Sequence, residues 1–129
     1  MTAATLSISV AEPPASWLVR PSVVVDGAVL AADACREASL PLAERHLEGK
    51  TLHAPRLLDH ELTSVAMDLL TDIAFHRASP DTVVPLADAY ALSASDADCL
   101  ALAAQLRVPL VTFDQRLGKA AVAHLRSLE

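Results

Sequence analysis

The chain has 129 residues, of which 53% are hydrophobic and 3% aromatic, and its formal net charge is −6. This length allows one domain with its own core, and the acidic balance excludes nucleic-acid binding that relies on a surplus of Lys and Arg. No apolar run approaches the roughly 20 residues that cross a bilayer, so we expect a cytoplasmic protein with no membrane partner.

The composition also indicates the fold class. Because aromatic residues are scarce, the core must be built from Leu, Val and Ala. These residues suit helices packed on a buried, mostly parallel sheet, so the predicted class is α/β. Residues 1–21 contain Pro13, Pro14 and Pro21 and show little periodicity. We interpret them as an irregular N-terminal extension to a single domain over residues 22–129.

The first half of this domain contains two predicted strands. The β-branched run at residues 22–26 predicts a buried strand, and an alanine-rich helix follows it. A second helix is expected over 40–49, where a proline stands near the start and Gly49 at the end. Residues 51–54 predict a second strand.

The second half is more helical. Leu58, Leu62, Val65 and Leu69 recur at helical spacing, so an amphipathic helix is predicted over 56–70. The next stretch is interpreted as a turn at residues 79–81, a brief strand at Val83-Val84 and a helical turn over 87–92. A long helix from Ser95, a strand ending before Asp114 and a terminal helix complete the chain.

Two aspartates stand where a predicted strand gives way to a loop. Asp26 follows three valines, and Asp114 follows LVTF. In open α/β sheets, ligands bind in the crevice outside the carboxyl ends of the strands. Either aspartate alone is more simply explained as a helix cap or turn residue, but two at equivalent positions indicate a site.

Three further acids lie on predicted helices. Glu61 stands at the edge of an apolar stripe, where it either joins the site or forms a surface ion pair. Asp96 lies in a first helical turn, where it points toward the packed side or interacts with the helix dipole. Asp98 is interpreted as part of a capping box with Ser95 as the N-cap, and only secondarily as an outer ligand.

The chemistry of such a cluster favours a metal ion. Carboxylates that converge on one crevice repel one another unless a divalent cation lies among them. Hard oxygen ligands suit Mg²⁺ or Mn²⁺, which could assist the hydrolysis of a phosphodiester. The histidines, by contrast, form no cluster with ligand spacing along the sequence, and the chain has no glycine-rich phosphate loop.

Four segments carry a resemblance to a known family. VVVDGAVL, LLDHEL, ASDADCLALAAQL and PLVTFDQRL resemble, in order and character, the acidic blocks of PIN-domain nucleases, especially the toxin ribonucleases of bacterial type II toxin–antitoxin pairs. The match covers about residues 22–120. It implies a three-layer α/β/α fold with a central, mostly parallel sheet.

The resemblance also implies roles for individual residues. Asp26, Glu61, Asp96 and Asp114 would be the catalytic acids that hold Mg²⁺ or Mn²⁺. Two further residues would support them, which are Thr112 as a nearby hydroxyl and Arg116 as a loop or phosphate contact. The implied protein is a dimeric endoribonuclease that cleaves RNA and is inhibited by a cognate antitoxin protein.

Some supporting positions depart from the family pattern. Ala28, Ser64 and Ser95 replace residues that usually surround the acids, and the span from Glu61 to Asp96 is short by about one helix. A degenerate PIN-like module that binds metal or a partner without cleavage is therefore an alternative. A phospho-acceptor signalling domain is disfavoured, because it should have paired acids after the first strand and a lysine at the end of a late strand.

Overall fold

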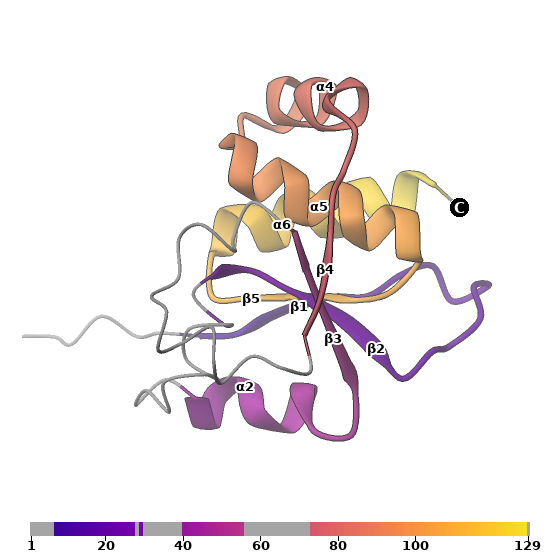
Figure 1. The fold of residues 1–129 in the computed structure, drawn as a ribbon, viewed down its shortest axis with the longest axis vertical. Helices are drawn as coiled ribbons and strands as arrows, with labels where there is room; N and C mark the ends of the chain where they lie inside the picture. Colours follow the sequence, from indigo (N-terminus) through magenta and orange to yellow (C-terminus); the bar gives the residue numbers. More distant parts are fainter. Residues whose placement is uncertain (1–6, 28, 30–39, 56–72, 129) are drawn as a thin grey trace, which may run out of the picture.

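The structure, a computed structural model, describes residues 7–27, 29, 40–55 and 73–128. The strands placed in this part of the chain are β1 (Ser9–Ala11), β2 (Ser22–Val25), β3 (Thr51–Pro55), β4 (Ile73–His76) and β5 (Leu110–Thr112). The helices are α2 (Leu40–Leu47), α4 (Pro80–Tyr90), α5 (Ala94–Leu106) and α6 (Gln115–Ser127). The chain is thus a mixed α/β protein (Figure 1).

The five strands form one sheet in the order β1-β5-β2-β3-β4. Only β1 is antiparallel to its neighbour, whereas β5, β2, β3 and β4 run parallel to one another. The predicted class, α/β with a mostly parallel sheet, is confirmed. Because four strands share one direction, their carboxyl ends meet at the same edge of the sheet, where α/β proteins commonly bind ligands.

The central strand β2 explains why helices lie on both sides of the sheet. Its three valines are buried, and successive side chains point to opposite faces. Val24 packs in the core beneath α5 and α6, while Val23 and Val25 pack with Leu47 of α2 in a second core. Figure 1 shows α2 on one side of the sheet and α5 and α6 on the other.

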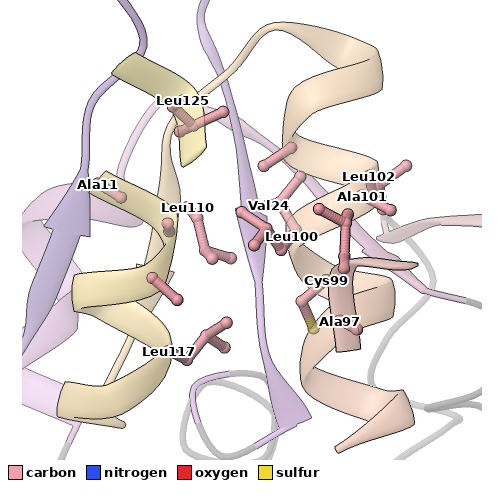
Figure 2. Packing of buried hydrophobic residues seen from close by; sticks show 14 of the residues in the cluster. Ala11, Val24, Ala97, Cys99, Leu100, Ala101, Leu102, Leu110, Leu117 and Leu125 are labelled. Atoms are coloured by element: carbon pink, nitrogen blue, oxygen red, sulfur yellow. The ribbon is translucent and has the colours of Figure 1, made fainter. Parts of the chain in front are cut away.

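The larger core lies between the sheet and the last two long helices. In Figure 2, Val24 and Leu110 of the sheet lie between side chains of α5, among them Leu100, and Leu117 and Leu125 of α6. All five are fully buried or nearly so. This packing holds β2, β5 and the two helices in fixed positions, and Asp26, Asp96 and Asp114 lie at the ends of these elements.

The region between residues 71 and 94 was predicted correctly only in part. The helical turn expected over 87–92 is confirmed for residues 87–90, which form the end of α4, but the other expectations were wrong. Ser79 is the N-cap of α4 and Pro80 its first residue, so 79–81 is a helix start and not an isolated turn. Val83 and Val84 lie inside this helix and form no strand. A proline is well tolerated in the first helical turn, where its missing N–H would be unbonded in any case. Strand β4 was missed altogether.

Other predictions had mixed outcomes. The strand predicted at residues 22–26 is found at Ser22–Val25. The helix ending before Gly49 and the strand from Thr51 are confirmed, and Gly49 has a positive φ of 72°. Residues 1–21 are not wholly irregular, because β1 pairs with β5. The alanine-rich helix after Asp26 and the amphipathic helix over 56–70 fall mostly or entirely outside the described residues. None of the helices in the described ranges is long and apolar enough to cross a membrane.

Gly118 lies on the side of α6 that packs against β1. A Cβ atom at this position would approach Ser9 Cβ to 2.6 Å and Ser9 Oγ to 2.8 Å. We expect Gly118→Ala to lower the free energy of unfolding by about 1–3 kcal/mol, as overpacked sites do, and urea denaturation measures this. Lys119→Ala, on the exposed side of α6, is the control and should change it little. Adding Ser9→Gly to Gly118→Ala removes the Ser9 atoms and should restore stability. A double variant no more stable than Gly118→Ala would contradict the clash.

Candidate functional site

Three acids come together at the carboxyl edge of the sheet. Asp26 directly follows β2, and Asp114 follows β5 by two residues, while β2 and β5 are adjacent and parallel. Asp96 lies in the first turn of α5, which packs on both strands. The charges of Asp96 and Asp114 both act on Asp26, and that of Asp114 acts on Asp96. The structure therefore brings together three of the four predicted catalytic acids.

The hydroxyl of Thr112 connects the two strand ends. It donates a hydrogen bond to Asp26 Oδ2, and it accepts one from the backbone N–H of Asp114 at 3.0 Å. The backbone N–H of Val29 donates to the other oxygen of Asp26 at 3.0 Å. Asp26 is only 6% exposed and Thr112 is fully buried. Thr112 was predicted as a supporting hydroxyl, and its hydrogen bonds are those of such a group.

The electrostatics of Asp26 result from opposing effects. Burial raises the pKa of its carboxyl, while the hydrogen bonds from Thr112 and Val29 lower it. The neighbouring charges of Asp96 and Asp114 raise it again, and the net direction is upward. Two donated hydrogen bonds favour the carboxylate, but they do not offset burial and like charge. A nearby cation would stabilise the ionised form of the Asp26 carboxyl.

Asp96 shares this environment. Burial raises the pKa of its carboxyl, and the charge of Asp114 raises it further. A hydrogen bond from Ser93 and the positive charge of Arg116 lower it, without reversing the direction. The guanidinium of Arg116 also donates from Nη2 to the carbonyl oxygen of Ala91 at 2.8 Å. Arg116, predicted as a loop or phosphate contact, thus makes a loop contact.

Asp114 also caps a helix. Its Oδ1 accepts hydrogen bonds from the backbone N–H groups of Arg116 at 2.8 Å and Leu117 at 3.3 Å, so it is the N-cap of α6. The alternative interpretation of this residue as a cap is therefore correct. Because the cap uses one carboxylate oxygen, it fixes the orientation of the side chain next to Asp26 and Asp96.

The predicted capping box of α5 was wrong by two residues. The N-cap is Ser93, whose Oγ accepts from the backbone N–H of Asp96 at 3.1 Å. Ser95 already lies inside the helix, so Asp98 is not its capping partner. Instead, Asp98 Oδ1 is buried without a hydrogen-bond partner in the described part of the chain, and burial raises the pKa of this carboxyl. Ser93 could have been recognised from the spacing Ser93-x-x-Asp96, which also matches a capping box.

The fourth predicted acid, Glu61, lies outside the described residues, so its position relative to the other three is open. Within ranges 7–27, 29, 40–55 and 73–128, no three His, Cys, Asp or Glu side chains are arranged as a ready metal site. Asp26, Asp96 and Asp114 therefore share an electrostatic environment without forming a complete ligand set among themselves.

Comparisons with known proteins add no relationship to this picture. No protein-family model matches the chain, and neither a curated protein nor a solved structure matches it significantly. The site must be interpreted from its own geometry.

We expect Thr112→Val to destabilise the protein. The substitution leaves a buried carboxylate oxygen of Asp26 and the N–H of Asp114 without their partner, which costs about 1–3 kcal/mol. Denaturation with urea measures the loss. Thr112→Ser keeps the hydroxyl and removes only the methyl group, so it should keep most of the stability. A Thr112→Val variant as stable as the wild type, or more stable than Thr112→Ser, would contradict the importance of these hydrogen bonds.

The stability of the metal-free protein should also depend on Asp96 in a pH-dependent way. A carboxyl whose pKa is raised in the folded state stabilises that state below its unfolded value of 3.8, and this contribution is lost as the pH rises through the folded pKa. Asp96→Asn, which has no such charge, should therefore gain stability relative to the wild type between pH 3.8 and 7. Urea titrations of both proteins in chelator test this. A difference that is constant with pH would contradict it.

Proposed function

We propose that the chain is a PIN-like endoribonuclease that hydrolyses RNA phosphodiester bonds with Mg²⁺ or Mn²⁺. The observation that carries this proposal is the convergence of Asp26, Asp96 and Asp114 from three elements on the carboxyl edge of a parallel sheet. Three carboxylates whose negative charges act on one another are unfavourable unless a cation lies among them. The three-layer α/β/α fold that the resemblance implies belongs to the same proposal.

The donor set is consistent with the proposed metal. Carboxylate oxygens are hard ligands of the kind that Mg²⁺ and Mn²⁺ prefer, and Asp26, Asp96 and Asp114 with Glu61 would hold the ion. When bound, such an ion helps to activate water and to neutralise charge on the phosphodiester. It would also offset part of the net charge of −6, which by itself repels RNA.

The chain's own residues would have separate tasks in this mechanism. Thr112 keeps the carboxylate of Asp26 in a fixed orientation by donating to one of its oxygens. The cap at the start of α6 fixes Asp114, and the hydrogen bonds of Ser93 fix the first turn that carries Asp96. A prearranged set of ligands needs less rearrangement when metal and substrate bind, which favours catalysis.

The resemblance extends to the biological setting. We propose that the protein acts as the toxin of a toxin–antitoxin pair in the cytoplasm, as a homodimer. An antitoxin protein would inhibit it by inserting a segment into the acidic groove.

An alternative is a degenerate PIN-like module that binds metal or a protein partner without cleaving RNA. One observation favours it. One oxygen of Asp114 is engaged in capping α6, which leaves that oxygen less available to a metal ion. Such a module would keep the acids at the sheet edge and lack turnover.

A cleavage assay tests the proposal. Purified protein should cut single-stranded or structured RNA in the presence of Mn²⁺ and lose activity in chelator. Asp26→Asn and Asp96→Asn should each reduce the rate at least about 100-fold, because each removes a proposed ligand of the catalytic ion. Asp88→Asn, which changes an exposed acid on α4, is the matched control and should leave the rate unchanged.

The outcomes separate the alternatives. Equal cleavage by the wild type and all three variants would show a contaminating nuclease and contradict the assignment of the acids. If no RNA is cut, Mn²⁺ titration by calorimetry decides between the remaining cases. Binding that is lost in Asp26→Asn supports the degenerate module, and no binding contradicts a shared metal site.

A further inference from the structure

Two histidines on neighbouring strands face each other. Within the described part of the chain, their hydrogen bond and ring contact are with each other and not with Asp26, Asp96 or Asp114. His53 lies within β3 and His76 is the last residue of β4. His53 Nδ1 and His76 Nε2 are 2.9 Å apart, and the ring centroids are 5.0 Å apart at an angle of 40°. We propose that these two nitrogens form a binding site for a divalent transition-metal ion such as Ni²⁺ or Cu²⁺.

The strand register explains why the rings meet. β3 and β4 are parallel, and His76 pairs with Pro55, two residues beyond His53 on the neighbouring strand. Residues two apart on a strand point to the same face, so both imidazoles project from the side of the sheet that carries Val24, the partner of His53 in β2. The two ligands are therefore held by hydrogen-bonded strands, which position a metal site more firmly than loops do.

The two nitrogens are close enough to bind one metal ion. With metal–nitrogen bonds of about 2.0–2.1 Å, two ligands at a right angle are about 2.8–3.0 Å apart, and tetrahedral ligands are about 3.3 Å apart. The observed 2.9 Å, which is the distance of a hydrogen bond in the metal-free pair, needs only a small ring rotation to fit either geometry. We choose Cu²⁺ and Ni²⁺ because imidazole is a preferred ligand for both and they bind nitrogen ligands tightly among the divalent metals. Water would occupy the remaining positions.

The protonation of the pair is compatible with metal binding. Burial and the charge of His76 lower the pKa of His53, which favours the neutral imidazole that metals require. In the metal-free pair one ring donates its N–H to the other. On binding, that ring takes its proton on its far nitrogen instead, so that both facing nitrogens present lone pairs and no net proton is lost.

The site is distinguishable from the proposed nuclease centre. The acids are hard oxygen ligands for Mg²⁺ or Mn²⁺, whereas the imidazoles are borderline ligands for later transition metals. The acids lie after β2 and β5 and at the start of α5, but the histidines join β3 to β4, which is the last strand in the described sheet order. A bound ion would hold β4 against β3.

Titration of the full chain with Ni²⁺ by calorimetry tests the proposal, in buffer containing excess Mg²⁺ to occupy the acids. The wild type should bind one equivalent with a dissociation constant below 1 mM, and His53→Gln and His76→Gln should each weaken binding at least about tenfold. His46→Gln, which changes a histidine of α2, is the control and should bind like the wild type. Asp26→Asn should also retain Ni²⁺ binding, so failure here is separate from failure of the nuclease proposal.

A second measurement does not depend on the stability of the variants. In the wild type, paramagnetic Ni²⁺ should first broaden the imidazole NMR signals of His53 and His76 and leave those of His46 sharp. Broadening of His46 before the pair, binding that is unchanged in both glutamine variants, or no binding at millimolar Ni²⁺ would each overturn the proposal.

Discussion

The hydrogen bond from Thr112 to Asp26 is the constraint on which the arrangement of the site depends. It joins the ends of two adjacent parallel strands, and the same hydroxyl accepts from the N–H of Asp114. The position of Asp114 in turn sets the start of α6, which it caps. One buried hydroxyl thus contacts the carboxylate of Asp26 and the backbone of Asp114, the residue that caps α6. The buried hydroxyl of Thr112 has lost its hydration, so it needs both of its hydrogen bonds. These bonds fix the positions of Asp26 and Asp114 relative to each other.

The buried, mutually repelling carboxylates of the site are unfavourable locally, and the packing of the rest of the fold stabilises them. Burial and neighbouring charges raise the pKa of Asp26 and Asp96, although each accepts hydrogen bonds that favour its charged form. The large core between α5, α6 and the sheet holds these residues in place against that cost. Concentrations of like charge are typical of functional sites, because packing elsewhere in a domain can stabilise an arrangement that is unfavourable locally.

Helix starts were the least predictable features, and one of them affects the site. Ser93 and Ser95 both precede an acid by three residues, so the sequence alone permits two capping boxes. The structure selects Ser93, and Asp98 becomes a partly buried acid instead of a capping residue. Similarly, Pro80 suggested a turn, because a proline starts a helix only where it falls in the first helical turn, as it does in α4. Such choices are decided by packing, since the competing local hydrogen bonds are of similar strength.

The sequence by itself determined the α/β class, the strands β2 and β3, and the placement of Asp26 and Asp114 at strand ends, because β-branched runs and strand-to-loop boundaries are local signals. Whether Glu61 joins the site stays a prediction. Only the tertiary structure decided that β1 completes the sheet beside β5, and that His53 and His76 face each other. Both facts depend on strand order and register, which arise from contacts between residues far apart in the chain and leave no periodic trace in the sequence.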